Sequence, residues 1–306
     1  MSLLAGFDLG GTHLKYGLLN KRGDIVFEGQ SDTPQKIEGL FSLLEDLWRK
    51  LKTKNSAAIS SAGFGFPGIF DTREQKILQS PNYPALDGFD LRPAIARFID
   101  VPFHINNDAN MAAYGEYRLG AGKNAQTMML ITIGTGVGSG IIQEGKIWQG
   151  TCGFAGELGH VTVNPNGESC KCGSKGCLET EISALKIVNN YRALSGYEEE
   201  ITSEDVFYRA KKSDDAARKA FAQAGRYLGI GLSIAINLIN PERILIGGGV
   251  IKAEEFLLFP ALEEAQKRAY DASFKCCQIQ RAALGNKAGF IGASLWAEEQ
   301  SLKQED

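Results

Sequence analysis

The sequence lacks a long hydrophobic run. The apolar segment Leu3–Phe7 is interrupted by Asp8 and has no basic flank, so it does not have the form of a signal peptide. The most apolar helical stretch, Ile230–Ile239, is too short to span the hydrocarbon core of a bilayer. We therefore expect a cytoplasmic protein with no membrane partner.

A block of basic charge is also missing. Lys and Arg number 33 against 36 Asp and Glu, which gives a formal net charge of -3. Nucleic-acid binding depends on clustered cationic side chains, so no nucleic-acid partner is expected. The sequence has neither the lysine-bearing P-loop motif nor the six-residue dinucleotide fingerprint, and this excludes both of those classes. At 306 residues and 43% hydrophobic, the chain is long enough for two domains with substantial cores.

Histidine and cysteine are scarce, with three and six residues, but they are not scattered. His160, Cys170, Cys172 and Cys177 fall within eighteen residues, interleaved with glycines. Four N and S ligands suit tetrahedral Zn²⁺ and leave no open position for a reacting water, so such an ion would be structural. A disulfide or a set of small buried thiols is the alternative, because the first two cysteines are separated by a single residue. A reducing compartment disfavours a lasting disulfide.

Two carboxylates flank this cysteine loop. Glu157 precedes it and Glu179 follows it, and Zn²⁺ does not need either of them once four other ligands are present. Both are free to accept hydrogen bonds, so they are candidates to bind a polyhydroxylated ligand.

Three glycine-rich turns follow predicted strands, at Asp8–Thr12, Gly134–Gly140 and Gly247–Gly249. Glycine lets backbone N–H groups approach phosphate oxygens, and Asp8 could hold hydrated Mg²⁺. One such turn alone would be weak support for a phosphate site. The likeness of the first two turns predicts two similar domains, and all three together predict a site for a nucleoside triphosphate.

Polar residues also gather where other predicted strands end. The strand Val101–Ile105 leads into Asn106–Asn110, and the strand Ile59–Phe66 ends in a Gly-Phe-Pro-Gly turn. Ligands collect at such strand ends in α/β proteins. Asp108 could alternatively serve as the N-cap of the helix that follows. Helical spacing of apolar residues predicts helices at 34–52, 214–240, 253–270 and 288–300, and the tail 301–306 is expected to be frayed.

Taken together, these motifs resemble the ROK family of sugar kinases, of the glucokinase type, within the actin and hexokinase superfamily. Asp8–Thr12 and Gly134–Gly138 match the two phosphate motifs of the family, Glu157–His160 its sugar motif, and Cys170–Glu179 its zinc signature. The likeness reaches from residue 8 to residue 292, which is nearly the whole chain.

The resemblance implies a duplicated ribonuclease-H-like α/β fold of the actin-like ATPase type, with two domains and a cleft between them. The smaller domain is expected to comprise residues 1–115 and 288–306. The larger domain, which would carry the zinc loop, is expected to comprise residues 116–287. The family likeness also suggests a homodimer.

Individual roles follow from the resemblance. Asp108 would be the catalytic base. His160 would serve the metal and the sugar through its two ring nitrogens, and Cys170, Cys172 and Cys177 would complete the zinc site. The residues implied to contact the sugar are Gly68, Asn82, Asn107, Asp108, Glu157, His160 and Glu179. The residues implied to bind ATP and Mg²⁺ are Asp8, Gly10, Gly11, Thr12, Thr132, Gly134, Thr135, Gly136, Gly248 and Gly249.

The expected activity is ATP-dependent phosphorylation of a hexose at its primary hydroxyl, with glucose giving glucose 6-phosphate. Fructose, mannose, N-acetylglucosamine and N-acetylmannosamine remain alternative substrates, because pocket shape decides among them. Polyphosphate could replace ATP as the donor. A sugar-responsive repressor is disfavoured, because the first phosphate motif begins at Asp8 and leaves no room for a preceding helix-turn-helix domain. A catalytically silent sugar sensor is disfavoured because Asp108 and both phosphate turns are present.

Overall fold

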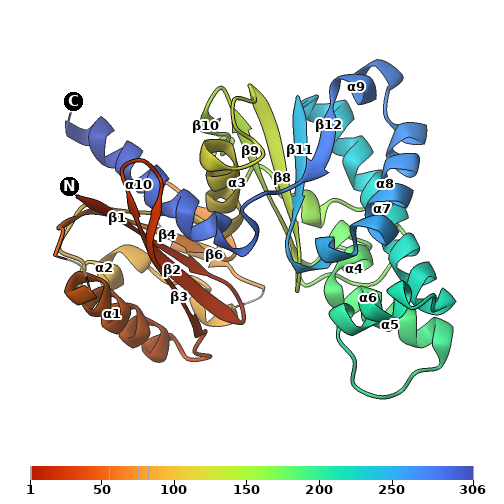
Figure 1. Ribbon diagram of the computed structural model, residues 1–306, viewed down its shortest axis with the longest axis horizontal. Coiled ribbons are helices and arrows are strands. Elements are labelled where there is room, and N and C mark those ends of the chain that lie inside the picture. The colour runs from red at the N-terminus through yellow and green to blue at the C-terminus, as the bar shows by residue number, and fades with distance from the viewer. Residues whose placement is uncertain (1, 55, 75, 82, 306) are drawn as a thin grey trace. The chain divides into compact units, whose positions relative to one another are not determined.

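The chain forms two compact units in the computed structural model, which describes residues 2–54, 56–74, 76–81 and 83–305. The first unit contains residues 1–126, 140–156 and 282–306, and the second contains residues 127–139 and 157–281. Both ends of the chain therefore belong to the first unit (Figure 1). The boundaries expected from the sequence assign residues 116–126, 140–156 and 282–287 to the larger domain, whereas here they cluster with the first unit.

The first unit is built on a five-stranded sheet in the order β3-β2-β1-β4-β7. β1 pairs antiparallel with β2, and β2 with β3, whereas β4 runs parallel to both β1 and β7. The strands are β1 (Leu3–Leu9), β2 (His13–Asn20), β3 (Ile25–Asp32), β4 (Ile59–Phe66) and β7 (Phe103–Asn107). Because β1, β4 and β7 are parallel, their carboxyl ends meet at one edge of the sheet.

One face of this sheet packs against α1 (Ile37–Lys54) and α2 (Leu91–Ile95). α1 is amphipathic, and its buried side chains recur at helical spacing: Leu40, Leu44, Leu47, Trp48 and Leu51. They join alternate residues of β1, such as Phe7 and Leu9, in one apolar core.

The opposite face packs against α10 (Ala288–Glu305), which lies alongside α3 (Asp108–Leu119) (Figure 1). Glycines on the strands make this close approach possible. A Cβ at Gly6 would lie 2.0 Å from the carbonyl oxygen of Phe290, and a Cβ at Gly63 would lie 1.9 Å from that of Ala293. The backbone of α10 therefore lies directly against β1 and β4 at these two glycines.

A small hairpin and two short 3₁₀ turns, at Pro84–Leu86 and Gly285–Lys287, complete the first unit. Strand β10 (Lys146–Ile147) also falls within the residues of this unit, although it pairs in the second sheet. The strands of the hairpin are β5 (Ile69–Asp71) and β6 (Lys76–Gln79). The hairpin was not expected from the sequence, because strands this short leave no clear alternation.

The second five-stranded sheet has the order β10-β9-β8-β11-β12. β11 runs parallel to β8 and to β12, so their carboxyl ends again share an edge. The strands are β8 (Thr127–Ile133), β9 (Val137–Gln143), β11 (Arg243–Gly247) and β12 (Gln278–Arg281), in addition to β10.

Helices α7 and α8 form the main helical pair of the second unit and run side by side (Figure 1). They approach closely because a Cβ at Gly225 would lie 2.4 Å from the carbonyl oxygen of Leu257, and one at Gly229 would lie 2.5 Å from that of Ala261. The helices of this unit are α4 (Leu178–Ile182), α5 (Ala184–Ser195), α6 (Ser203–Lys211), α7 (Asp215–Ile239), α8 (Glu254–Arg268) and α9 (Asp271–Cys276). Two 3₁₀ turns, Leu158–His160 and Gly249–Ala253, complete the unit.

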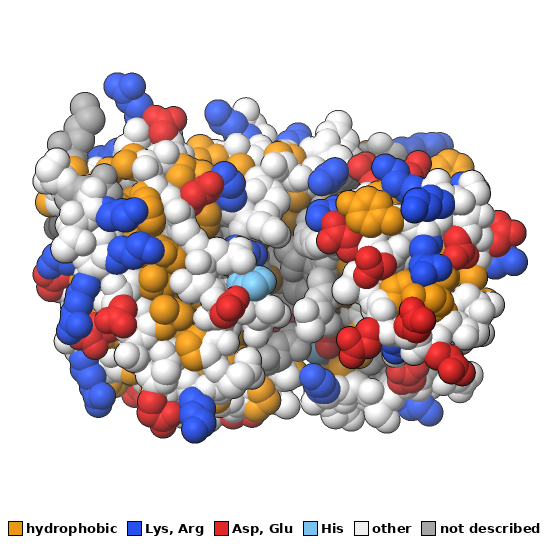
Figure 2. All heavy atoms as spheres, turned by 60° about the horizontal axis from the view of Figure 1, so that its bottom comes forward, with side chains coloured by type: hydrophobic (Ala, Val, Ile, Leu, Met, Phe, Trp, Pro, Cys, Tyr) orange, Lys and Arg blue, Asp and Glu red, His pale blue; other side chains and the backbone are white. Residues whose placement is uncertain are grey.

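The predicted helices are present, with ends that shift by at most five residues. The prediction of a frayed tail is wrong for most of its length, because α10 continues to Glu305. No helix of the described ranges is both long and apolar enough to cross a bilayer. Charges of both signs are interspersed over the face drawn in Figure 2, in keeping with the small net charge.

Candidate active site

The carboxyl edge of the first sheet brings Asp8 and Asp108 to the two sides of one strand. Asp8 on β1 is opposite Gly65 on β4, and β4 in turn pairs with β7, which leads into Asp108. A Cβ at Gly65 would lie 3.2 Å from the Cα of Asp108. Glycine at this position therefore lets the start of α3 approach the strand beside Asp8.

Asp108 is the first residue of α3, and the N-cap is Asn107. The side-chain oxygen of Asn107 accepts hydrogen bonds from the backbone N–H groups of Ala109 and Asn110, at 2.9 and 3.1 Å. The alternative role considered for Asp108, that of N-cap, thus belongs to its neighbour. The Asp108 carboxylate therefore lies in the first turn, near the positive end of the helix dipole.

Asn107 also positions the turn at Gly68. Its Nδ2 donates to the carbonyl oxygen of Gly68 at 2.9 Å. Gly68 has a φ of 109°, and a Cβ there would lie 2.5 Å from the carbonyl oxygen of Gln79, so only glycine fits. Asn82, the other predicted sugar contact in this part of the chain, lies outside the described residues.

Asp8 is partly buried and lies next to α10. Burial raises its pKa from 3.8 to about 6, although the nearby Lys15 ammonium partly offsets the rise. A Cβ at Gly289 would lie 2.3 Å from the Asp8 carboxylate. A desolvated carboxylate gains free energy when a cation binds it, so Asp8 fits the chemistry of a Mg²⁺ ligand.

The first glycine turn is held by its own backbone. The N–H of Gly10 donates to the carbonyl oxygen of His13 at 2.9 Å, and the Thr33 hydroxyl donates to the carbonyl oxygen of Gly10 at 2.8 Å. Gly11 and Thr12 are exposed at the tip of this turn. Their exposure leaves room for phosphate oxygens.

The other two glycine turns lie together at the carboxyl edge of the second sheet. Gly247 on β11 is opposite Thr132 on β8, and a Cβ at Gly248 would lie 2.2 Å from the carbonyl oxygen of Ile133. By contrast, a Cβ at Gly134 or at Gly249 would meet nothing within 4 Å. The two turns therefore pack against each other on one side and are open on the other.

The Thr132 hydroxyl donates to the carbonyl oxygen of Gly138 at 3.3 Å, and the N–H of Gly134 donates to the carbonyl oxygen of Gly136 at 2.9 Å. These bonds fix the shape of the second turn, and Thr135 stands exposed at its tip. Turns of this kind present backbone N–H groups to anions.

The predicted zinc ligands converge. The ligand atoms of His160, Cys170, Cys172 and Cys177 all lie within 4.8 Å of one another. His160 Nδ1 is 3.7 Å from Cys170 Sγ, and the sulfurs of Cys172 and Cys177 are 3.6 Å apart. Zn–S bonds of about 2.3 Å in a tetrahedron require ligands about 3.8 Å apart. The four side chains therefore fit a structural zinc ion, whereas the sulfur separation is far longer than the S–S bond of about 2.0 Å in a disulfide.

The loop that carries these ligands is tied to the preceding turn. The carbonyl oxygen of Gly176 accepts hydrogen bonds from the N–H groups of Val163 and Asn164, at 2.9 and 3.1 Å. Gly176 has a φ of 63°, and a Cβ there would lie 1.6 Å from the carbonyl oxygen of Asn164. The close crossing of these two segments therefore requires glycine.

Val137 links three of the predicted motifs of the second unit. Its N–H donates to Glu179 Oε2 at 2.8 Å, so a predicted sugar residue is bonded to the second glycine turn. A Cβ at Gly159 would lie 2.1 Å from the carbonyl oxygen of Val137, which places the Glu157–His160 motif against the same residue. The exposed Glu157 side chain stands at the start of that motif.

The structure thus gathers the predicted residues into two sets. The first-unit set is Asp8, Gly10, Gly11, Thr12, Gly68, Asn107 and Asp108. The second-unit set is Thr132, Gly134, Thr135, Gly136, Glu157, His160, Cys170, Cys172, Cys177, Glu179, Gly248 and Gly249. One contact was not predicted, the bond from the Val137 N–H to Glu179. The backbone role of Val137 left no signal in the sequence.

This pair of α/β units with glycine turns at the sheet edges is the actin-like ATPase fold. The chain belongs to the ROK family, whose family model matches residues 4–300.

Among its relatives, the glucokinase of Halalkalibacterium halodurans is 35% identical, and the match covers 98% of this chain and 96% of that protein. The xylose repressor of Bacillus subtilis is 29% identical over 94% of this chain and 75% of the repressor. The solved structure of a ROK family glucokinase from Streptomyces griseus, in complex with glucose and AMPPNP, superposes with a TM-score of 0.85 at 29% identity. That superposition covers 97% of this chain and 100% of the other.

Proposed function

We propose that the protein is an ATP-dependent sugar kinase that phosphorylates the primary hydroxyl of a hexose, with glucose as the substrate. The observation that carries the proposal is the placement of Asp8 and Asp108 on either side of Gly65, at one sheet edge. A metal-binding carboxylate and a base so arranged suit phosphoryl transfer, which depends on position and charge neutralisation more than on covalent catalysis. The kinship with glucokinases, one of them solved with glucose and AMPPNP, supports the same assignment.

In the proposed reaction the hydroxyl oxygen of the sugar attacks the γ-phosphorus as its proton passes to the Asp108 carboxylate. The bond from the γ-phosphorus to the bridging oxygen breaks, and ADP leaves. The glycine turns at Gly10–Thr12 and Gly134–Gly136 would hold the phosphates through the N–H groups at their exposed tips, Gly11, Thr12 and Thr135, with Gly248 and Gly249 as further nucleotide contacts. A Mg²⁺ ion held through Asp8 would neutralise the charge of the phosphates.

The sugar would be bound by carboxylate, amide, imidazole and backbone groups. We assign this role to Gly68, Asn82, Asn107, Glu157, His160 and Glu179. Zn²⁺ in the His160 and cysteine site would act through geometry, because it has no open coordination position. His160 Nδ1 faces Cys170, which leaves Nε2 to donate to a sugar hydroxyl. We expect the enzyme to work in the cytoplasm. We also expect a homodimer, and light scattering on the purified protein will test this oligomeric state.

The test is a coupled assay that measures ADP release with ATP and a panel of sugars: glucose, fructose, mannose, N-acetylglucosamine and N-acetylmannosamine. Glucose is expected to give the highest kcat/KM, and another hexose in first place would redirect the substrate within the same class. Polyphosphate replaces ATP in a parallel series that measures the sugar phosphate formed, because this donor leaves a shortened polyphosphate and releases no ADP. Absence of phosphorylation with every sugar and both donors would refute the kinase assignment.

A sugar sensor without turnover is the second candidate, because a xylose repressor is among the relatives. Calorimetric binding of a sugar by a protein that releases no ADP would favour it. The base at Asp108 and the two open glycine turns favour the kinase.

A further inference from the structure

Glu116 is a fully buried charged residue near the end of α3, with an exposed fraction of 0%. Its carboxylate accepts three backbone hydrogen bonds. Oε2 accepts from the N–H groups of Ala121 and Ala283, both at 3.0 Å, and Oε1 accepts from the N–H of Leu284 at 2.6 Å. The side chain therefore joins the end of α3 to a segment more than 160 residues later, just after the chain has returned from β12 to the first unit.

This arrangement requires a carboxylate. A buried charge is tolerated only when it is well hydrogen-bonded, and here both oxygens receive N–H donors. A glutamine of the same size would place its NH₂ group where one of the oxygens now stands. In either orientation that group would face at least one backbone N–H, so donors would oppose donors.

The turn after α3 is shaped around the carboxylate. The N–H groups of Gly120 and Gly122 both donate to the main-chain oxygen of Glu116, each at 3.0 Å. A Cβ at Gly120 would lie 2.0 Å from Glu116 Oε2. Gly120 has φ -106° and ψ -149°, so its φ is not left-handed, and the methyl group of an alanine there would displace the carboxylate.

The anchored segment leads directly to the neighbour of Asp8. Leu284 is followed by the turn Gly285–Lys287 and then by the first turn of α10, where Gly289 abuts the Asp8 carboxylate. α10 has little freedom to adjust, because a Cβ at Gly292 would lie 1.7 Å from the carbonyl oxygen of Met111 on α3. A displacement of Leu284 would therefore also move the first turn of α10, where Gly289 packs against the Asp8 carboxylate.

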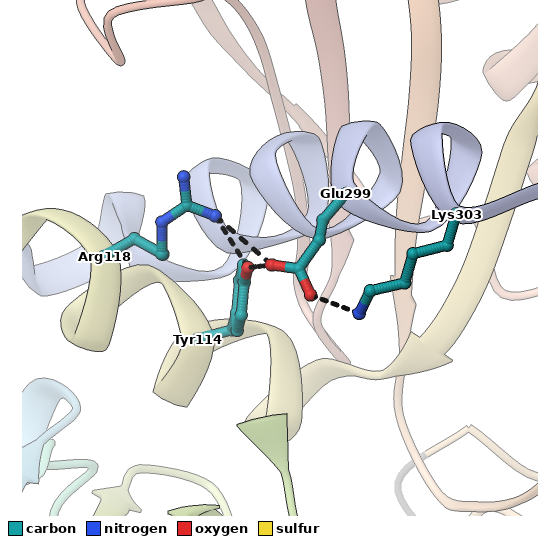
Figure 3. Close-up of polar contacts among 4 residues, drawn as sticks. All are labelled: Tyr114, Arg118, Glu299 and Lys303. Carbon is teal, nitrogen blue, oxygen red and sulfur yellow. Dashed lines mark hydrogen bonds and ion pairs between the residues drawn. The ribbon is translucent and has the colours of Figure 1, made fainter. Parts of the chain in front are cut away.

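The far end of α10 is held differently. There Tyr114 and Arg118 of α3 meet Glu299 and Lys303 of α10 in a partly exposed network (Figure 3). This network joins α3 directly to α10, whereas Glu116 joins α3 to the segment that precedes α10, and the network lies about three to four turns along α10 from the Asp8 contact. It provides a matched control.

From these contacts we propose that Glu116 is a positioning residue of the kinase: its carboxylate holds Ala283 and Leu284 so that the first turn of α10 keeps Asp8 in place for the nucleotide's Mg²⁺. The proposal rests on the function assigned above. Glu116 contacts neither phosphate nor sugar in this role, and it acts through Leu284 and Gly289.

The kinetic test compares Glu116→Gln with Tyr114→Phe at saturating sugar. For Glu116→Gln we expect kcat to fall at least tenfold and the apparent Mg²⁺ constant to rise at least fivefold, with the sugar KM within twofold of wild type. For Tyr114→Phe we expect a lower Tm but every kinetic constant within twofold. An unchanged Mg²⁺ constant in Glu116→Gln, or an equal change in both variants, overturns the proposal.

A second measurement does not depend on activity. Amide hydrogen exchange in the wild-type protein should show protected N–H groups at Ala283 and Leu284, and Glu116→Gln should exchange them at least tenfold faster. Rapid exchange at both positions in the wild type would refute the anchoring. If Glu116→Gln does not fold, Gly120→Ala receives the same two measurements, because it displaces the carboxylate without changing it. If the wild-type protein protects these amides but phosphorylates no sugar, the Glu116 anchor is supported and the kinase assignment is refuted.

Discussion

The two glycine hairpins of the molecule share a plan and differ in one side chain. β1 and β8 are both seven residues long, and each leads through a glycine turn into its partner strand. At the last but one position of the strand, β1 has Asp8 and β8 has Thr132. The Asp8 carboxylate is crowded by α10 and has a raised pKa, whereas the Thr132 hydroxyl is bonded to its own turn.

The difference shows how a repeated scaffold acquires two functions. A threonine hydroxyl can support a turn and contribute a donor to a phosphate, but it cannot neutralise charge. A dehydrated carboxylate can bind a cation, at a cost in stability when no cation is present. The first unit thus holds the charged groups proposed for chemistry, and the second holds the metal loop proposed for sugar binding.

The largest effect is expected from removing the base of the first unit. Asp108→Asn should lower kcat by roughly 10²–10⁴-fold, or about 3–5 kcal/mol of transition-state stabilisation, because the hydroxyl loses its proton acceptor. The sugar KM should change much less. Steady-state kinetics measure both, and Asp46→Asn on the exposed side of α1 is the control. Near-normal turnover in a folded Asp108→Asn protein would remove this assignment.

Loss of zinc should act on the second unit alone. Cys172→Ser is expected to abolish stoichiometric zinc and to lower the free energy of unfolding of that unit by about 4 kcal/mol, because the loop loses its cross-link. Metal analysis and amide exchange measure the two effects. Cys276→Ser, on the exposed α9, should retain both zinc and stability. A wild-type protein without zinc that is fully active would show that the loop needs no metal.

Separate replacement of the two corresponding side chains, Asp8 and Thr132, tests the comparison directly. Asp8→Asn should reduce kcat by about 10²-fold, close to 3 kcal/mol. It should also weaken the binding of Mg²⁺, because a neutral amide attracts the cation less than a carboxylate does. Thr132→Val should change kcat by less than about tenfold, because only one neutral hydrogen bond is lost. Mg²⁺ titrations at fixed ATP measure both variants. Equal decreases in kcat for the two variants would mean that the two hairpins have the same role in the reaction.

The smallest effect concerns acid stability of the first unit. His104 is buried against Trp296, its Nε2 has no hydrogen-bond partner among the described residues, and burial lowers its pKa from 6.5 to about 4. The unfolded chain binds the proton more tightly, so this histidine destabilises the fold as the pH falls from 6.5 to 4. The loss between pH 7 and pH 5 should be about 2 kcal/mol.

Denaturant unfolding at both pH values measures this loss, and His104→Phe should remove it while keeping the ring contact. His13→Phe, an exposed position, is the control. An equal change of stability with pH in the wild-type protein and in His104→Phe would refute the attribution.

The parts of the site that the sequence predicted well depend on neighbours in the chain. The His160 and cysteine cluster comes from one loop, and its ligand spacing was enough to predict convergence. The amphipathic pattern of α1 was equally local. Glycine turns after apolar strands also follow from local chemistry.

The parts that the sequence did not predict depend on distant contacts. The bonds from Glu116 to Ala283 and Leu284 span more than 160 residues, and no spacing rule connects them. The extra turns of α10 beyond residue 300 depend on packing along α3, and the tail itself reads as polar and short. The bond from Val137 to Glu179 joins a backbone group to a side chain 42 residues away, so no side-chain pattern reveals it.

Gly289 has a consequence for how such a protein could change its role. A single methyl group at this position would occupy the space of the Asp8 carboxylate, and the three nearest atoms that it would meet all belong to Asp8. Gly289→Ala should therefore retain sugar affinity by calorimetry and lose turnover, and unchanged turnover would contradict this. One carbon atom would then separate a protein that consumes its ligand from one that only reports the ligand's presence.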